Sequence, residues 1–130
     1  MEKRYVIDTD ILFEYLHDES RAITFLENVS GMLFVSAISV SELYAGVREG
    51  PERGALEQFL AAFDIVEISA DVAILAGLYG RDYSQKYGVK LADVLVAATA
   101  KSKNASLVTL NAKRYPMLKN VVVAYNKDDT

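Results

Sequence analysis

Apolar residues along this chain fall into two kinds of run that alternate from one end to the other. Short β-prone runs are typical of strands, whereas longer stretches with apolar residues three or four positions apart are typical of helices. The pattern predicts strands at residues 5–7, 32–35, 65–68, 107–109 and 121–123. It predicts helices at residues 10–17, 21–29, about 39–49, 52–63, 71–87 and 91–101.

The predicted strands are mostly runs of apolar residues and do not alternate strictly between apolar and polar residues. A strand of that kind is buried on both faces, and strands separated by helices favour a parallel sheet covered on both sides. We therefore expect an α/β fold with a central, mainly parallel sheet of four to five strands. The chain has 130 residues, 52% of them hydrophobic, which suits one domain over residues 1–130, with a loose tail at 126–130.

The amino-acid composition excludes several kinds of functional site and indicates the cellular compartment. The chain has no cysteine, which excludes disulfides, thiolate catalysis and cysteine-ligated zinc, and a reducing cytoplasm is the expected compartment. The first five residues are charged and do not resemble a signal peptide, and no apolar run approaches the roughly 20 residues that span a bilayer. We expect a soluble, cytoplasmic protein with no membrane contact.

Charge is distributed unevenly, although the net value is only −4. Residues 1–80 carry 5 basic and 14 acidic side chains, whereas residues 81–119 carry 8 basic and 2 acidic ones. A cationic track beside an anionic pocket is one interpretation, and ordinary solvated helix faces are the other. The basic residues that we single out for phosphate contacts are Lys86, Lys90, Lys101, Lys103, Lys113 and Arg114.

Four polar residues are expected at one edge of the sheet. Asp8 directly follows the first strand, Glu42 lies one turn into the helix after the second strand, and Asn111 lies just beyond the strand at 107–109. Ligands of open α/β sheets bind beyond the carboxyl ends of the strands, so these side chains should face one crevice. Asp93 lies in the first turn of the very apolar helix at 91–101 and adds a carboxylate there.

Each acid also has a simpler explanation. Asp8 can cap the first helix, Glu42 can pair with Ser39 in a capping box, and Asp93 can complement a helix dipole. Capping does not require three carboxylates to converge, however, and converging carboxylates repel one another unless a cation or protons neutralise them. Oxygen ligands of this kind suit Mg²⁺ or Mn²⁺, and such an ion suits phosphoryl chemistry.

Four segments together resemble a known family. The stretches "VIDTDIL", "ISVSELYAGV", "LADVLVAATA" and "LVTLNAKRY" are similar, in order and spacing, to the signatures of the PIN-domain family, and in particular to VapC-type ribonuclease toxins of prokaryotic toxin–antitoxin pairs. The resemblance implies a three-layer α/β/α domain that is usually dimeric, cleaves RNA with Mg²⁺ or Mn²⁺ and is silenced by a small cognate antitoxin. It also implies that Asp8, Glu42 and Asp93 form the acidic metal site.

The chain departs from that family pattern in the last segment. The fourth acidic position, often Asp, is Asn111 here, and Arg114 stands before Tyr115 where relatives often have an acid. The weaker negative charge predicts one firmly held ion, with any second ion arriving with substrate. Arg114 is a candidate for contact with a substrate phosphate.

Neighbouring residues have secondary roles in this hypothesis. Asp10 lies two positions after Asp8 and is interpreted first as a first-turn helix residue, with metal ligation as the alternative. Thr9 and Thr109 either orient carboxylates or satisfy backbone groups at strand ends. His17, the single histidine, is interpreted as a surface or packed residue because no serine or cysteine nucleophile motif accompanies it.

The resulting hypothesis is an endoribonuclease in which Asp8, Glu42 and Asp93 hold the ion and Asn111 helps to position it or its water, while an activated water attacks the scissile phosphate. Two alternatives remain. One is a catalytically degenerate domain of the same fold that binds only RNA or a partner, which Asn111 favours. The other is a haloacid-dehalogenase-like phosphatase with Asp8 as nucleophile, although its second acid has no better candidate than Asp128 and Asp129 in the tail.

Overall fold

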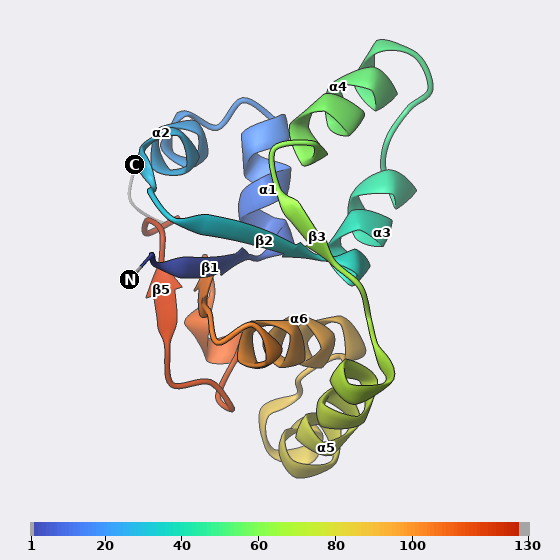
Figure 1. Ribbon diagram of the computed structural model, residues 1–130, viewed down its shortest axis with the longest axis vertical. Helices are drawn as coiled ribbons and strands as arrows, with labels where there is room; N and C mark the ends of the chain where they lie inside the picture. The colour runs from blue at the N-terminus through green and yellow to red at the C-terminus, as the bar shows by residue number, and fades with distance from the viewer. Residues whose placement is uncertain (1, 128–130) are drawn as a thin grey trace.

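Five short strands form one sheet in the order β3-β2-β1-β4-β5, and all four neighbouring pairs are parallel (Figure 1). A computed structural model describes residues 2–127 of the chain. The strands are β1 (Arg4–Ile7), β2 (Met32–Ser36), β3 (Asp64–Val66), β4 (Ser106–Thr109) and β5 (Val121–Val123). The predicted α/β class with a parallel sheet of four to five strands is confirmed.

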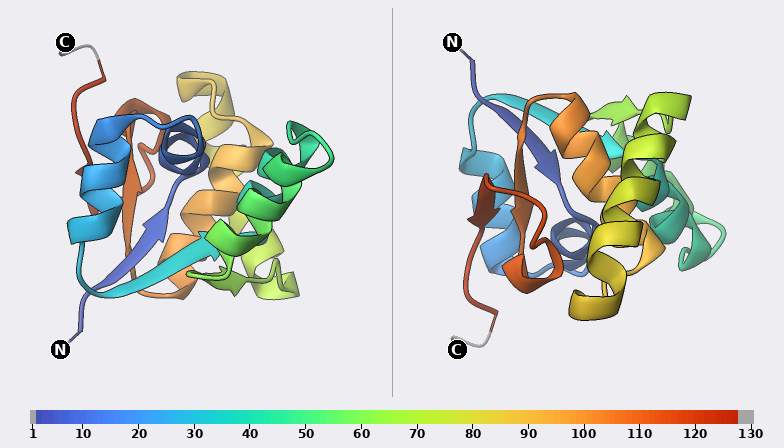
Figure 2. Two further views of the ribbon diagram at one scale, coloured as in Figure 1. Left: turned by 90° about the horizontal axis from the view of Figure 1, so that it is seen from above. Right: turned by 90° about the horizontal axis from the view of Figure 1, so that it is seen from below.

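Helices cover both faces of the sheet. The helices are α1 (Thr9–Leu16), α2 (Ser20–Asn28), α3 (Ala37–Ala45), α4 (Pro51–Leu60), α5 (Ala70–Tyr87) and α6 (Leu91–Ser102), followed by the 3₁₀ helix η1 (Ala112–Arg114). Figure 1 and Figure 2 show α1, α2 and α4 over one face, α6 under the other and α5 outside α6, which gives the three-layer arrangement. Helix α3 lies at the sheet edge and touches α1, α4 and α6.

Alternate residues of the central strand supply the two cores. Val6 packs with α6 in one buried cluster, whereas Ile7 packs with Ile11 and Leu12 of α1 in the other, and all four side chains are fully buried. Because successive side chains of a strand point to opposite faces, a run of apolar residues is required wherever both faces are covered. The double coverage explains why β1 carries no polar alternation.

The order of the strands creates a binding crevice next to β1. The chain runs from β1 to β2 and β3 on one side, and later returns to place β4 and β5 on the other side of β1. The connections therefore diverge at the carboxyl ends of β1 and β4, which is where open α/β sheets bind ligands. Asp8 directly follows β1, and Thr109 is the last residue of β4.

The start of α3 differs from the prediction. The capping residue is Ser36, whose Oγ accepts a hydrogen bond from the Ile38 amide at 3.2 Å, and Ser39 lies buried inside the helix. The proposed capping box of Ser39 and Glu42 is therefore wrong, because β2 passes into α3 with no connecting loop. The helix ends at Ala45 and not at residue 49.

Two further findings concern the ends and surface of the fold. The Asn126 carbonyl accepts a hydrogen bond from Arg21, and Lys127 is paired with Glu14 at 2.7 Å, while the remainder of the predicted loose tail lies outside the described residues. Between residues 2 and 127, none of the helices combines the length and the apolar character needed to cross a membrane.

Candidate active site

The two carboxylate oxygens of Asp8 accept hydrogen bonds from different parts of the structure. Its Oδ1 accepts a hydrogen bond from the Thr9 amide at 2.8 Å and so caps α1. Its Oδ2 accepts from the Thr109 hydroxyl at 2.8 Å, the Tyr115 hydroxyl at 2.7 Å and Arg114 Nη2 at 3.1 Å. Only 2% of Asp8 is exposed, so these four donors replace its hydration. Asp8 therefore caps a helix, as one interpretation of the sequence expects, and also faces the crevice, as the other expects.

Asp10 joins the same cluster. Its Oδ1 accepts from the Ile11 amide at 2.7 Å, while its Oδ2 accepts from the Leu110 amide at 3.0 Å and from Arg114 Nη2 at 2.9 Å. The sequence favoured a plain first-turn role for Asp10, and the structure shows that its second oxygen also faces the crevice.

Asp93 enters the crevice from the first turn of α6. Its Oδ2 accepts from the Lys90 amide at 3.2 Å, and its Oδ1 lies 3.5 Å from Arg114 Nη1. As in Asp8, one oxygen caps a helix and the other faces the shared cation. Carboxylates from β1, α1 and α6 therefore meet at a single guanidinium group, that of Arg114.

Glu42 lies beside this cluster, one hydrogen bond away. Its Oε1 accepts from the Thr9 hydroxyl at 2.8 Å, and the same hydroxyl lies 2.7 Å from the Ser39 Oγ. Thr9 is the residue next to Asp8, so this hydrogen bond holds Glu42 close to the crevice. Glu42 is nevertheless exposed, and none of the ion pairs recorded among the described residues joins it to Arg114. Thr9 and Thr109 each contact a predicted carboxylate, as expected of residues that orient such groups.

Asn111 has a different position from the other predicted residues. Its side chain is exposed, and its Oδ1 accepts a hydrogen bond from the Lys113 amide at 3.2 Å, which caps η1. The structure does not bring its amide oxygen to the three aspartates. Asn111 instead shapes the turn that carries Arg114.

The electrostatics of the cluster follow from burial and crowding. Burial, together with the negative charge of Asp8, raises the pKa of Asp10 from 3.8 to about 6. Burial and the neighbouring Asp8 likewise raise the pKa of Tyr115, so its hydroxyl stays a neutral donor. Three carboxylates share one guanidinium, and the cluster retains an excess of negative charge that favours binding of a further cation.

The donor chemistry fits a hard divalent ion, because hydroxyl and carboxylate oxygens line the crevice and neither thiol nor imidazole does so among the described residues. As they stand, no three acidic or histidine side chains between residues 2 and 127 are spaced to hold an ion together. In this arrangement the Arg114 guanidinium lies where the aspartates converge, and Glu42 is turned to Thr9.

A hollow of about 320 Å³ opens beside Asp93. It is lined by Tyr87, Gly88, Val89, Lys90, Asp93, Lys113 and Arg114. Three cationic side chains therefore border the carboxylates on one side, and these are among the basic residues that the sequence analysis singled out.

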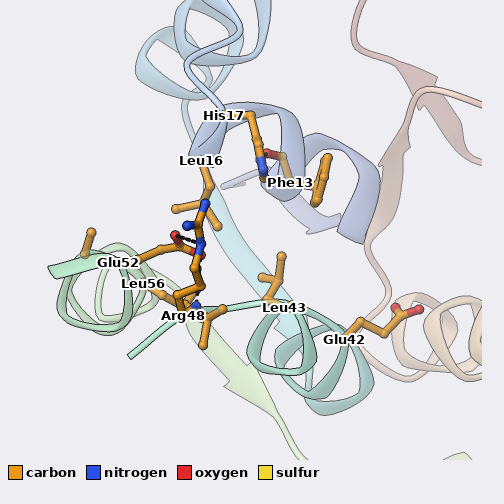
Figure 3. A pocket seen from close by; sticks show the side chains of 11 residues that line it. Phe13, Leu16, His17, Glu42, Leu43, Arg48, Glu52 and Leu56 are labelled. Carbon is orange, nitrogen blue, oxygen red and sulfur yellow. Dashed lines mark hydrogen bonds and ion pairs between the residues drawn. The ribbon is translucent and has the colours of Figure 1, made fainter. Parts of the chain in front are cut away.

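A separate pocket of about 390 Å³ lies between α1, α3 and α4. Figure 3 shows Glu42 at its edge, with the carboxylate turned away from Arg48 and Glu52. His17 lines this pocket and stacks on Phe13 with ring centroids 4.0 Å apart, which agrees with the predicted packing role.

Sequence reasoning missed Tyr115 and the contacts that Arg114 makes with the aspartates. Tyr115 is almost fully buried and donates to Asp8 across 107 residues of sequence, and nothing in its local pattern signals that contact. Arg114 was considered as a phosphate ligand, but its contacts with Asp8 and Asp10 depend on the turn after β4. The sequence did contain one signal for the Arg114 contacts, because Arg114 is a basic residue at a position where relatives often have an acid.

Comparison with known proteins agrees with the fold. Ribonuclease VapC19 of Mycobacterium tuberculosis is 34% identical over 124 residues, covering 92% of this chain and 98% of the relative. Ribonuclease VapC10 of the same organism is 31% identical over 119 residues, covering 89% of each chain. A chain of a toxin-antitoxin complex from Klebsiella pneumoniae superposes with a TM-score of 0.80 at 27% identity, covering 93% of this chain and 98% of that one. The model of the family described as PIN domain matches residues 5–116, and the chain belongs to that family.

Proposed function

We propose that the chain is a Mg²⁺- or Mn²⁺-dependent endoribonuclease, with Asp8, Glu42 and Asp93 as its acidic metal site. The observation that carries the proposal is the convergence of Asp8 and Asp93, 85 positions apart in the chain, on one cationic group in the crevice between β1 and β4. Such a crevice is the usual ligand site of an open α/β sheet, and its oxygen donors match the preference of these ions.

The described side chains have separate parts in this chemistry. Thr109 and Tyr115 hold Asp8 Oδ2 in a fixed direction, and the Thr9 hydroxyl does the same for Glu42. A bound divalent ion would supply Lewis-acid polarisation of the scissile phosphate and of the attacking water. Asn111 acts indirectly, because it caps the turn that presents Arg114 to the crevice.

RNA as substrate is supported by the names of the relatives, which are ribonucleases. The hollow with Lys90, Lys113 and Arg114 adjoins Asp93, where positive charge would meet the sugar–phosphate backbone on one side of the scissile bond. The proposal therefore places the RNA strand across this hollow and the reacting phosphate over the aspartates.

A small antitoxin is the proposed partner, because a structural neighbour is a toxin-antitoxin complex. The excess negative charge of the crevice gives such a partner a simple means of inhibition, which is to insert an Arg or Lys side chain where the ion binds. We also propose a homodimer, for which the exposed Ile74 and Leu78, one turn apart on α5, provide apolar surface.

Of the two alternatives, the domain that binds only RNA or a partner is supported by the positions of Arg114 and Asn111. Arg114 already fills the point of convergence and Asn111 is turned away from it, as in a domain that no longer binds metal. The phosphatase is disfavoured, because only 2% of Asp8 is exposed and its Oδ2 already accepts hydrogen bonds from three donors, which leaves this oxygen unable to attack a phosphate.

The test is cleavage of mixed cellular RNA by the wild-type chain and by Asp93→Asn, each with Mn²⁺ or with EDTA. We expect wild-type cleavage only with Mn²⁺, and a loss of at least about 100-fold in Asp93→Asn because a charged ligand is removed. The matched control is Asp71→Asn, which removes an exposed first-turn acid from α5 and should cleave at the wild-type rate. Cleavage that survives EDTA, or equal rates for Asp93→Asn and wild type, would overturn the proposal.

A further inference from the structure

The hydrogen bonds of Asp8 leave no lone-pair direction of Oδ2 open for an ion. Three donors from three residues surround this oxygen at 2.7, 2.8 and 3.1 Å. A carboxylate oxygen offers about two lone-pair sites, so an ion can bind Oδ2 only after at least one donor leaves. The question is which donor can move.

Two of the three donors are fixed by their surroundings. Thr109 is fully buried at the end of β4, and Tyr115 is 2% exposed within the core cluster under β1. Moving either side chain would open a void in a closely packed interior. Arg114 is different, because 36% of its side chain is exposed and it lies on a short turn.

Arg114 is also the only one of these donors that carries charge. Its guanidinium lies 2.9 Å from Asp10, 3.1 Å from Asp8 and 3.5 Å from Asp93, so one positive group links all three aspartates. Its Nε is buried and has no hydrogen-bond partner within residues 2–127, so this binding mode leaves one donor of the guanidinium unsatisfied. The arrangement neutralises the acids but is an incomplete fit for an arginine.

We propose that Arg114 is an internal counter-ion of the acid cluster, and that a divalent ion binds only when the Arg114 side chain moves out of the crevice. The inference rests on the proposed function, since it takes the aspartates as the metal site. The guanidinium holds the three carboxylates together in the metal-free chain and competes with the ion for the same oxygens.

The structure provides space for the displaced side chain. Arg114 itself lines the hollow of about 320 Å³ beside Asp93, together with Lys90 and Lys113. A guanidinium that turns into this hollow joins two other cations next to the proposed path of the RNA backbone. The planar guanidinium can bind a phosphate there through two hydrogen bonds. The ion and the substrate phosphate would then favour the same displaced position.

Competition of this kind lowers the apparent affinity for the ion. If only the displaced form binds metal, the measured affinity is reduced by the fraction of molecules in that form, which is commonly a tenth or less for a minor state. Removal of the guanidinium should therefore tighten Mn²⁺ binding by roughly tenfold. If Arg114 instead served only to organise the carboxylates, its removal would weaken binding.

The experiment is titration of the full chain with Mn²⁺ in the absence of RNA, with free Mn²⁺ measured by electron paramagnetic resonance. Arg114→Met keeps an unbranched apolar stem and removes the charged guanidinium, and Arg114→Lys keeps the charge but cannot span three carboxylates. Lys113→Met is the matched control, because it removes the same charge one position away from an exposed side chain that lines the hollow. We expect roughly tenfold tighter binding for Arg114→Met, an intermediate value for Arg114→Lys and less than about a twofold change for Lys113→Met.

Stability gives an independent readout. In EDTA, Arg114→Met should unfold at lower urea concentration than wild type, since its aspartates lack their counter-ion, and saturating Mn²⁺ should raise its midpoint more than that of wild type. Equal or weaker Mn²⁺ binding by Arg114→Met, or an equal gain for Lys113→Met, would overturn the inference while leaving the metal site standing. Absence of Mn²⁺ binding by every protein, wild type included, would overturn the metal site and the inference together.

Discussion

Single residues in the crevice make two kinds of contact at once. Asp8 and Asp93 each use one oxygen to satisfy a helix amide and the other to face Arg114. A hydrogen bond to a helix amide does not keep either carboxylate out of the crevice, because its other oxygen remains turned toward Arg114. The sequence offers helix capping and a position in the crevice as alternatives for Asp8 and Asp93, and the structure shows that each residue does both.

Tyr115→Phe tests how much the buried donor contributes to Asp8. The substitution keeps the ring in the core and removes the hydroxyl that donates at 2.7 Å, so the free energy of unfolding should fall by about 2 kcal/mol, as for a hydrogen bond to a charged group. Urea denaturation in EDTA measures the change.

Tyr125→Phe is the matched control for that measurement. The Tyr125 hydroxyl is buried and has no hydrogen-bond partner among the described residues, so its removal should change the free energy of unfolding by less than about 0.5 kcal/mol. Equal losses in the two variants would contradict the assigned role of Tyr115.

Helices and strands show how much of the molecule local patterns determine. All five strands and six helices were expected from apolar spacing, and most bounds differ by one or two residues. The start of α3 was misplaced because both Ser36 and Ser39 suit a cap, and only the length of β2 decides between them. The site was predictable for residues at strand ends, whereas the contacts of Arg114 and Tyr115 depend on a turn whose geometry has no local signature.

Gly31 in the connection from α2 to β2 is one position that a side chain should not tolerate. Its φ is +141°, and an added Cβ would lie 2.5 Å from the Lys3 carbonyl oxygen. Gly31→Ala should lower the free energy of unfolding by about 3 kcal/mol through strain and overlap. Gly54→Ala in α4, where an added Cβ would meet nothing within 4 Å beyond the neighbouring backbone of its own helix, should instead raise the free energy of unfolding by about 0.5 kcal/mol. Denaturant midpoints of the two variants that shift in the same direction would refute this comparison.

Glu19 at the start of α2 should make stability depend on pH. Hydrogen bonding and ion pairing with Arg21 lower its pKa from 4.5 to about 2. A carboxyl whose pKa is lowered by folding stabilises the chain fully above its unfolded pKa, and the benefit disappears as pH falls from about 4.5 to 2. Glu19→Gln should therefore be less stable than wild type at pH 7, and the difference should shrink towards pH 3.

Glu27→Gln provides the control for that pH series, since it removes an equal charge from an exposed position of the same helix. Urea midpoints at several pH values between 7 and 3 measure both variants. A difference between wild type and Glu19→Gln that stays constant with pH would show that Glu19 acts only as a neutral cap.

The whole molecule separates its charges along the chain and brings them together again at one edge of the sheet. Residues 81–119 carry a net charge of +6, and three of their cations border the hollow beside Asp93. The acidic first part of the chain supplies Asp8, Asp10 and Glu42 to the same edge. A chain of net charge −4 can thus present positive charge to RNA next to a negative crevice, which the overall charge alone does not predict.

The double variant Lys90→Ala, Lys113→Ala should weaken RNA binding with little effect on Mn²⁺ binding. Loss of two backbone contacts to single-stranded RNA should reduce the slope of log affinity against log salt by about 1.4. The control is Lys3→Ala, Lys119→Ala, at the amino ends of β1 and β5 on the opposite edge of the sheet, which should leave the slope unchanged. Filter binding in EDTA, where cleavage is blocked, measures both. Equal slopes for the two double variants would exclude the hollow as the RNA path.

In the proposed metal site, Asp8 and Asp93, with Glu42 beside them, hold a divalent ion at the point where Arg114 now lies. The most direct measurement is anomalous X-ray scattering from crystals of the full chain soaked in Mn²⁺. We expect one strong peak within about 2.5 Å of Asp8 and Asp93 oxygens, with the Arg114 guanidinium moved into the adjacent hollow. A crevice without a peak, and with Arg114 still bound to all three aspartates at saturating Mn²⁺, would contradict it.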